Sequence, residues 1–303
     1  MQLQLRPLAL DLAKLDGLSA RLVASHHENN YTGAVKRLNA IRDQLSGLDW
    51  THAPVFTING LKREELIAAN SAWLHELYFD SLGGNGAVPI GGMSVALERD
   101  FGSLARWRDE FASLAKAMGG GSGWALLSWS TREARLINHW AADHTHLLAG
   151  ATPVLALDMY EHAYHMDFGA KAAAYVDAFM RNIEWNGVFR RYADAVQLGS
   201  MPWAAQPADS PKYSQLVDVR RAETYAQGTD KLRGATWRDP TRIASWVAEL
   251  DRSKPVLVYC LHGLDIGRAS ALALRVRGFD AHFIAGGIEA CREAGVPLSP
   301  KND

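Results

Sequence analysis

The sequence lacks several features that would place it in a specialised class of proteins. Among its 303 residues there are only two cysteines, Cys260 and Cys291, which excludes a disulfide framework and is typical of a reducing compartment. No run of about 18 apolar residues is present, so we expect no membrane-spanning helix. The first residues contain no long apolar stretch followed by a cleavage site, and we therefore expect a cytoplasmic protein.

Net charge is also nearly absent. The formal net charge is -1 at pH 7, so nothing draws the chain as a whole to nucleic acid or to an anionic membrane surface. Hydrophobic residues make up 48% of the chain and charged residues 21%, which is ordinary for a globular protein. The chain is too long for one typical domain and comfortable for two. We therefore expect two domains and neither a nucleic-acid nor a membrane partner.

Helical periodicity dominates the first part of the chain. Apolar residues recur at steps of three and four along residues 10–45 and again along 62–82, which predicts two helices paired as an α-hairpin. After the glycines at 119–121, short apolar runs predict a small sheet instead. Strands are expected at 123–129, 133–140 and 152–157, and further helices at 104–118 and 170–193. This is an α+β pattern, an α-hairpin followed by a small α/β subdomain.

A stretch with several prolines divides the chain. Residues 199–212 hold three prolines among small and polar residues, which predicts a linker. Beyond it strand and helix patterns alternate, which predicts a small α/β domain with a parallel sheet. We expect a first domain at 1–198, with its hairpin up to about residue 90 and its α/β part over 91–198, and a second domain at 213–303.

The histidines are unevenly distributed. Nine of the eleven precede residue 166. His26 and His75 lie in the apolar stripes of the two predicted helices, whereas Asp158 directly follows an apolar strand and His162 comes four residues later. Taken alone, Asp158 and His162 fit a capped helix start better than a metal site. With a histidine from each helix they form a set of three nitrogens and one oxygen, which suits iron, manganese or zinc better than magnesium or calcium.

Four motifs carry a family resemblance. They surround His26 and occupy the segments 73–75, 121–124 and 158–164. In these motifs, and in their order, the chain resembles the iron/manganese superoxide dismutases over about residues 1–197. The resemblance implies the fold of that family for the first domain.

The resemblance also implies a function. It implies one iron or manganese ion per chain, held by His26, His75, Asp158 and His162 with a solvent molecule as fifth ligand. The implied reaction is the dismutation of superoxide by alternate one-electron reduction and oxidation of the ion, which excludes zinc. It further implies a homodimer, or a dimer of such dimers, in which Glu161 reaches the partner's His162.

The sequence departs from the family around the expected substrate funnel. The family's histidine four residues after the first ligand and its tyrosine eight residues after it are Asn30 and Ala34 here. Tyr31, on the same helix, is our candidate for the missing hydroxyl. His165 stands where the family has a tyrosine, so His165 and Asn30 are expected to have exchanged roles. These changes bear on rate and proton delivery more than on metal binding.

One more residue is expected beside the ion. The group that hydrogen-bonds the metal-bound solvent is glutamine or histidine in the family. His144 is our candidate for this role and His146 the second choice. A polar loop without any such role is an equally good interpretation of this segment.

The second domain has one candidate reactive residue. Cys260 lies between the apolar run 256–259 and a helix, whose dipole is expected to lower the thiol pKa and favour a thiolate or persulfide. A buried structural cysteine is the alternative. Residues 213–303 resemble a rhodanese domain, which implies sulfane-sulfur transfer with Cys260 as the persulfide carrier. The segments that carry this resemblance are 216–220, 234–235, 259–263 and 286–288.

The second domain departs from its family in charge. The usual basic residue five positions after the cysteine is Asp265 here, and an acidic neighbour opposes both a thiolate and an anionic donor such as thiosulfate. Arg268 is expected to compensate by folding back toward the cysteine. Cys291 is expected to be a packing residue.

Two other functional hypotheses stay open. One is a regulatory or sulfur-handling protein whose metal site is structural. The other treats both domains as inactive interaction modules; the complete ligand set opposes it, and Asn30, Ala34 and Asp265 favour it. Sequence motifs do not distinguish iron from manganese, because that selectivity depends on residues around the ligands.

Overall fold

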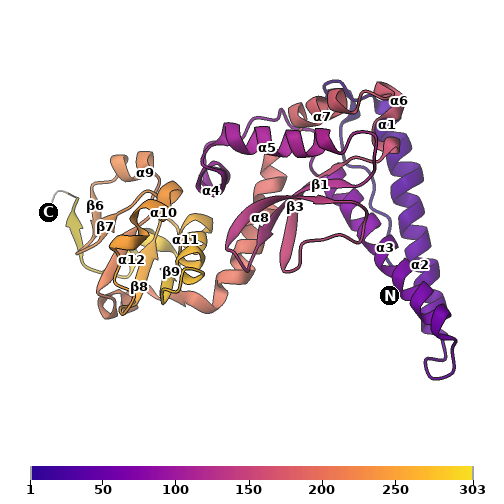
Figure 1. The fold of residues 1–303 in the computed structure, drawn as a ribbon. Helices are drawn as coiled ribbons and strands as arrows, with labels where there is room; N and C mark the ends of the chain where they lie inside the picture. Colours follow the sequence, from indigo (N-terminus) through magenta and orange to yellow (C-terminus); the bar gives the residue numbers. More distant parts are fainter. Residues whose placement is uncertain (1, 302–303) are drawn as a thin grey trace.

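Two long helical arms pair at one end of the molecule (Figure 1). The computed structural model describes residues 2–301. The arms consist of α1 (Ala20–Ser25), a π-helical turn η2 (His26–Tyr31), α2 (Thr32–Ser46) and α3 (Val55–Phe79). Ser19 caps the first arm, because its side-chain oxygen accepts a hydrogen bond from the backbone N–H of Leu22. The predicted α-hairpin is therefore confirmed.

A three-stranded antiparallel sheet follows the hairpin. Its strands are β1 (Trp124–Ser130), β2 (Arg135–Ala141) and β3 (Ala151–Asp158), in the order β2-β1-β3. The surrounding helices are α4 (Gly92–Phe101), α5 (Leu104–Ala117), α7 (Ala172–Arg181) and α8 (Trp185–Ser200). Shorter helical turns are η1 (Leu12–Lys14), η3 (Glu161–Ala163) and α6 (His165–Phe168). Every residue of the central strand β1 is buried, as the apolar run at this position predicts.

One apolar cluster joins the hairpin to this sheet. It includes Leu22 from the first arm, Tyr78 from the second, Trp124 and Leu155 from the sheet, and Phe179 from α7. Burial of this shared surface fixes the helices against the end of β3. Side chains on the two arms and at the strand end can therefore meet at one point.

A five-stranded parallel sheet forms the centre of the C-terminal part. Its order is β4-β9-β8-β5-β7. The strands are β4 (Ala204–Ala205), β5 (Gln215–Asp218), β7 (Thr236–Trp237), β8 (Val256–Tyr259) and β9 (Ala281–Ile284). A two-stranded sheet adds β6 (Asp230–Leu232) and β10 (Leu298–Pro300). The helices are α9 (Ala222–Gln227), α10 (Ile243–Trp246), α11 (Asp265–Arg275) and α12 (Gly287–Glu293), with short turns η4 (Met201–Trp203), η5 (Pro207–Lys212), η6 (Pro240–Arg242) and η7 (Val247–Glu249).

The segment expected to be a linker is structured. Helix α8 continues to Ser200, and β4 then pairs with β9 as an edge strand of the parallel sheet. Prolines are compatible with this arrangement, because they occupy the short helical turns on either side of β4. We refer to residues 2–200 as the N-terminal unit and to residues 201–301 as the C-terminal unit.

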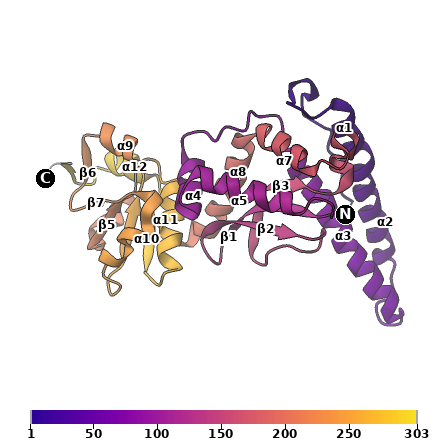
Figure 2. The ribbon, with the colours of Figure 1, turned by 45° about the horizontal axis from the view of Figure 1, so that its top comes forward.

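The two units share an apolar interface. Helix α11 packs against α8, and its residues Ala269 and Leu272 belong to the same buried cluster as the N-terminal core. Helix α4 also contacts α11 and the turn η6 (Figure 2). No helix of the described part of the chain is long and apolar enough to cross a membrane. The interface places the start of α4 beside the start of α11.

Candidate functional site

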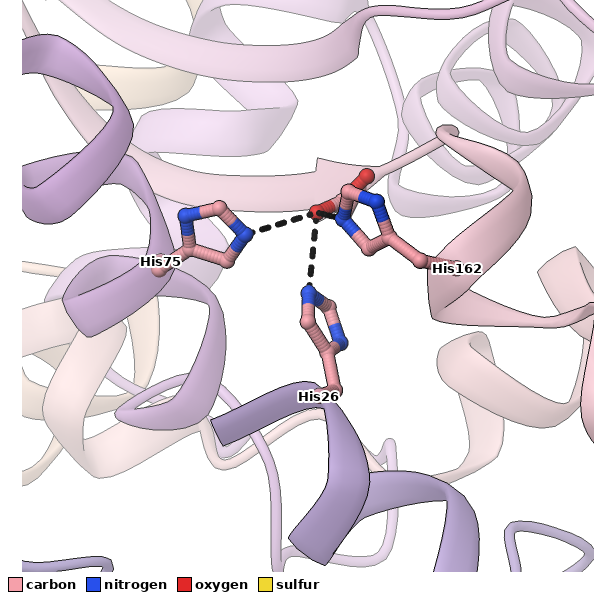
Figure 3. A group of neighbouring side chains, drawn as sticks. His26, His75 and His162 are labelled. Carbon is pink, nitrogen blue, oxygen red and sulfur yellow. Dashed lines mark hydrogen bonds and ion pairs between the residues drawn. The ribbon is translucent and has the colours of Figure 1, made fainter. Parts of the chain in front are cut away.

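The four predicted metal ligands come from four separate segments and meet at one point (Figure 3). His26 opens the π-helical turn, His75 lies in α3, Asp158 is the last residue of β3, and His162 lies in the short turn η3. One potential ligand atom from each residue lies within 4.8 Å of every other. The apolar stripes of the two arms and the end of the buried strand explain why these side chains point inward.

The separations fit ligands that share one ion. Asp158 Oδ2 lies 3.2 Å from His26 Nε2, 3.2 Å from His162 Nε2 and 3.4 Å from His75 Nε2. Nitrogen and oxygen ligands bind a transition metal at about 2.0–2.2 Å, so two adjacent ligands lie about 3–3.6 Å apart. The observed distances fall within this interval.

Hydrogen bonds orient these ligands from behind. His75 Nδ1–H donates to the carbonyl oxygen of Ser71 at 2.6 Å, which leaves a lone pair on His75 Nε2 facing the centre. That buried Nε2 has no hydrogen-bond partner among the described residues. Asp158 Oδ1 accepts a hydrogen bond from the Tyr160 backbone N–H at 2.8 Å, so Oδ2 is the oxygen left for an ion. His75 Nε2 and Asp158 Oδ2 are thus both left to bind an ion, as a metal site requires.

The charge states also suit a cation. Burial alone would raise the pKa of Asp158, but hydrogen bonds from His162 and His26 hold that pKa well below its usual range. Burial lowers the pKa of His26, and it lowers the pKa of His75 to about 3. At neutral pH the site therefore presents an ionised carboxylate and neutral buried imidazoles, the protonation states that bind a metal. Of the four ligands only His162 is partly exposed, at 29%, so solvent approaches from its side.

His144 lies next to this cluster. Trp124 Nε1–H donates to His144 Nδ1 at 3.0 Å, and the His144 ring stacks on Tyr160 with ring centroids 5.0 Å apart. The centroid of His75 is 6.1 Å away. Because burial lowers the pKa of His144 and its Nδ1 accepts, the neutral ring holds its proton on Nε2. His146, the second choice, is exposed, pairs with Asp143 and stacks on Trp140 instead.

Tyr31 is committed to other partners. Its hydroxyl donates to Glu76 Oε1 at 2.8 Å and accepts from the Arg6 backbone N–H at 3.0 Å. Burial raises the pKa of Tyr31 to about 12. The N-terminal segment thus draws this hydroxyl into a cavity of about 200 Å³ lined by Arg6 and Asp80, and no hydrogen bond links it to any of the four ligands in the described chain. The other funnel positions differ in exposure, with Ala34 buried, Asn30 half-buried and His165 exposed.

Two aromatic residues complete the wall of the site. The Tyr78 ring lies 5.1 Å from that of His26, and its hydroxyl accepts a hydrogen bond from Tyr175 at 3.2 Å. Tyr78 is not among the site residues that the sequence predicts, although it follows His75 by three residues and so lies on the same helical face. The Tyr160 ring stacks on that of His162 at 5.4 Å. These rings exclude water from most of the centre.

The second candidate site is centred on the thiol of Cys260. Cys260 follows β8 and precedes α11, as predicted, and backbone N–H groups of Gly263, Leu264 and Gly267 point toward its sulfur. The expectation of a lowered thiol pKa is nevertheless wrong. Burial raises the pKa of Cys260, and the nearby charge of Asp265 raises it further; the backbone N–H groups oppose this without reversing it.

Two charged residues were expected near this thiol, and Asp265 is its acidic neighbour as predicted. Arg268 donates to the carbonyl oxygen of Gly263 at 3.1 Å and to Ser200 Oγ at 3.3 Å, so its guanidinium is anchored at the unit interface. It still lies close enough to Cys260 to interact with that thiol electrostatically. Cys291 is buried in an apolar cluster.

Comparison with known proteins identifies both parts of the chain. The model of the family "Iron/manganese superoxide dismutases, C-terminal domain" matches residues 89–191, and that of "Rhodanese-like domain" matches residues 200–294. An iron superoxide dismutase from Cupriavidus metallidurans is 63% identical over 197 residues, which covers 65% of this chain and 100% of that protein. An iron superoxide dismutase from Aquifex pyrophilus is 33% identical, covering 60% of this chain and 88% of that protein. A manganese superoxide dismutase from Halobacterium salinarum is 31% identical, covering 60% and 90%.

Proposed function

Because this chain belongs to the iron/manganese superoxide dismutase family, we propose that it dismutates superoxide to hydrogen peroxide and dioxygen at one iron or manganese ion per chain. His26, His75, Asp158 and His162 hold the ion in this proposal. The observation that carries it is the convergence of three imidazole nitrogens on Asp158 Oδ2 at 3.2–3.4 Å, inside a buried aromatic wall. Relatives that are named for iron and for manganese both support the proposal and leave the choice of ion open.

The bound ion would supply one-electron redox chemistry, which none of the side chains at this site provides alone. The chain's own residues bind the ion, orient the groups around it and supply a proton. Asp158 contributes a full negative charge that favours a highly charged cation. His144 holds a proton on Nε2 beside the centre, because its Nδ1 accepts from Trp124. We propose this proton as a hydrogen-bond donor to the ligand that occupies the open position.

We further propose a homodimer, or a dimer of such dimers, formed through the face around His162. Glu161 and His165 are exposed on this face, together with Met166 at 44% exposure. A partner that covers it would narrow the approach to the ion, with Glu161 reaching the partner's His162. We place the protein in the cytoplasm, since both of its cysteines are unpaired.

For the C-terminal unit we propose sulfur transfer with Cys260 as a persulfide carrier. The observation that favours this second function is a thiol at the strand-to-helix junction, surrounded by backbone N–H donors that suit a persulfide anion better than an apolar pocket would. Burial raises the pKa of this thiol, so its resting form at neutral pH is the neutral thiol.

Metal analysis joined to a superoxide assay tests the first function. We expect about one iron or manganese per chain, since the four ligands are preformed, and dismutation at a rate that Asn30 and Ala34 lower relative to other members of the family. Fully metallated protein without activity would instead favour the alternative, a regulatory or sulfur-handling protein with a structural metal site. Protein that contains zinc alone would contradict the dismutase proposal.

A further inference from the structure

A cavity of about 240 Å³ opens beside Cys260 at the interface of the two units. Both units contribute to its wall. The residues that matter for its chemistry are Gly91, Gly92, Arg221, Thr224, Cys260 and Asp265. Pockets for drug-sized ligands have about 300–1,000 Å³, so this one suits a smaller molecule.

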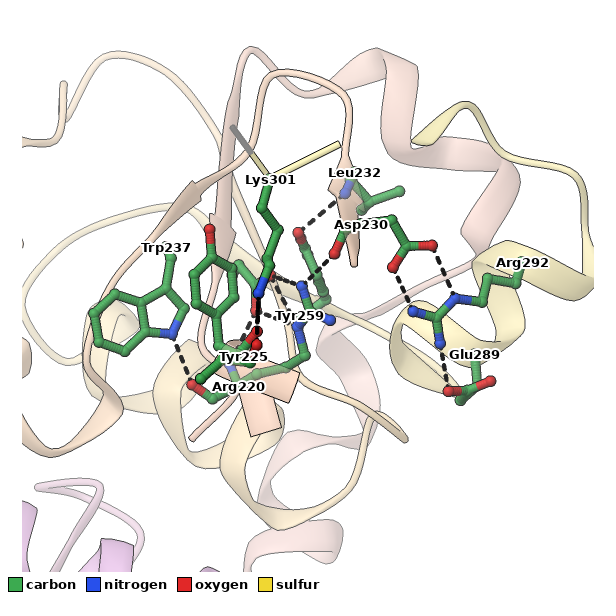
Figure 4. A network of polar contacts seen from close by, with 11 residues as sticks. Arg220, Tyr225, Asp230, Leu232, Trp237, Tyr259, Glu289, Arg292 and Lys301 are labelled. Atoms are coloured by element: carbon green, nitrogen blue, oxygen red, sulfur yellow. Dashed lines mark hydrogen bonds and ion pairs between the residues drawn. The ribbon is translucent and has the colours of Figure 1, made fainter. Parts of the chain in front are cut away.

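The cavity contains one unpaired cation. Arg220 also lines the cavity, but Asp218 neutralises its guanidinium at 2.5–3.0 Å. The same guanidinium donates to the Asp230 carbonyl oxygen at 2.8 Å (Figure 4). Arg221, in contrast, makes no side-chain hydrogen bond or ion pair with any residue of the described chain, yet it lines the cavity. Its guanidinium is therefore available to an anionic group of a ligand.

The cavity also contains one unpaired anion. Asp265 lines the cavity, and its buried Oδ2 has no hydrogen-bond partner among residues 2–301. A buried carboxylate oxygen without a partner is costly, and a ligand donor would satisfy it. The charges of Arg99 and Arg221 lower the pKa of Asp265 electrostatically, without a hydrogen bond to it.

The N-terminal unit fixes the position of this anion. A Cβ atom on Gly92 would lie 1.8 Å from Asp265 Oδ2 and 2.9 Å from the Phe189 ring. Only a residue without a side chain leaves room there for the carboxyl group. The geometry of the Cys260 site thus depends on the first turn of α4, which belongs to the metal-binding unit.

We propose that this cavity binds a small zwitterionic sulfur donor, namely an α-amino acid that carries a persulfide. The donor's carboxylate pairs with Arg221, its ammonium group with Asp265, and its terminal sulfur meets Cys260. This inference rests on the carrier function proposed above and names its substrate class. A dianion such as thiosulfate would pair with Arg221 but be repelled by Asp265, whereas a zwitterion satisfies both charges.

The transfer balances without an added oxidant. Cys260 loses its thiol proton, and the thiolate attacks the terminal sulfur of the donor's persulfide. A sulfur–sulfur bond forms on Cys260 as the sulfur–sulfur bond of the donor breaks. The donor leaves as a thiolate and takes up a proton, so a thiol and a persulfide exchange one sulfur atom.

Two matched donors test the proposal on the unsubstituted chain with both units present. Cysteine persulfide and the persulfide of 3-mercaptopropionate both carry the carboxylate, but only the first has an ammonium group. With cyanide as sulfur acceptor, we expect kcat/KM for thiocyanate formation to favour cysteine persulfide by about tenfold, the effect of one charge-assisted pair. Thiosulfate should be poorer than both.

Variants then test which charged side chain binds which group of the donor. Asp265→Asn should remove the preference for the ammonium group. Because it also removes the charge that raises the pKa of Cys260, the rate with the other persulfide should rise rather than fall. Arg221→Gln should lower kcat/KM for both persulfides about tenfold. Glu293→Gln is the control, because Glu293 is an exposed acidic residue of α12 that does not line the cavity.

Mass spectrometry of Cys260 distinguishes the carrier function from the preference for a zwitterionic donor. If both persulfides load sulfur onto Cys260 equally well, the zwitterion proposal is overturned while the carrier function stands. If no donor loads Cys260, or if Cys260→Ser leaves thiocyanate formation unchanged, the carrier function itself is overturned, and the substrate proposal with it.

Discussion

Two largely buried carboxyl groups, Asp158 and Asp265, behave in opposite ways in the two halves of this molecule. Hydrogen bonds from His162 and His26 hold the pKa of Asp158 well below its usual range, although burial alone would raise it. Burial raises the pKa of Asp265 to about 6, because its Oδ2 has no hydrogen-bond partner among the described residues. Burial raises the pKa of both carboxyl groups, so the number of hydrogen-bond partners decides in which direction each pKa finally moves.

The same contrast separates the two sites as wholes. At the metal centre Ser71 orients His75, Tyr160 orients Asp158 and Trp124 orients the neighbouring His144, all within the N-terminal unit. At Cys260 the charges are unpaired and one wall comes from the other unit. We therefore expect substitutions at the metal centre to be severe and local, and substitutions around Cys260 to be milder and to act across the interface.

The largest effect should follow loss of a metal ligand. His75→Ala removes one of four protein ligands from a buried site, so we expect most of the metal to be lost and dismutation to fall by at least about 100-fold. Elemental analysis and a superoxide assay measure both. His52→Ala, which changes an exposed histidine in the loop between the two arms, is the matched control. Full metal content in His75→Ala would contradict the assignment.

A smaller effect is expected at His144. His144→Ala removes the imidazole that Trp124 orients, and we expect turnover at saturating superoxide to fall by about 10- to 100-fold with metal content retained. Pulse radiolysis of metallated protein gives the rate. His146→Ala provides the comparison, because that histidine is exposed and two residues away. Equal rates in the two variants would remove His144 from the mechanism.

The metal ligands were within reach of sequence reasoning for a physical reason, whereas His144 was proposed only from the family resemblance. Ligands such as His75 and Asp158 lie at positions that local periodicity defines, a helical stripe and a strand end. The Tyr31 hydroxyl was not predictable in this way, since its direction depends on a contact with Arg6 that lies outside its helix. The sequence also identified the helix start near Cys260 but not the depth of burial, and burial determines the direction of the thiol pKa shift.

The interface contact itself was beyond sequence reasoning. Gly92 and Asp265 are far apart in the chain, and no local pattern relates them. The family resemblances describe each unit separately, and neither predicts how the units pack. The apolar residues Ala269 and Leu272 of α11 could equally have served the core of their own unit.

The next test addresses this contact. Gly92→Ala places a methyl group against Asp265 and Phe189, so we expect kcat/KM for sulfur transfer from cysteine persulfide to fall by about tenfold, because the carboxyl group must move. Metal content should not change. Gly33→Ala is the control, since nothing lies within 4 Å of the added Cβ atom. Normal sulfur transfer in Gly92→Ala would show that the two units act independently.

The smallest expected effect concerns stability and pH. The folded chain binds the Asp265 proton more tightly than the unfolded chain does, because the pKa of this carboxyl rises to about 6 on folding. The free energy of unfolding therefore falls as the pH rises from about 4 to about 6, and the full penalty remains above that window. Asp265→Asn removes the penalty, so it should stabilise the protein by about 1 to 3 kcal/mol near pH 7.5 and have almost no effect near pH 4.

Thermal unfolding of the two proteins at both pH values measures this difference, and comparison at equal pH cancels the titration of other groups. Glu293→Gln removes an exposed acidic side chain of the same unit and should change stability little at either pH. If Asp265→Asn destabilises the protein near pH 7.5, the carboxylate must have a partner that satisfies it. A stabilised variant that has also lost its preference for the zwitterionic donor would show that the chain retains an unpaired carboxylate for binding at the expense of stability.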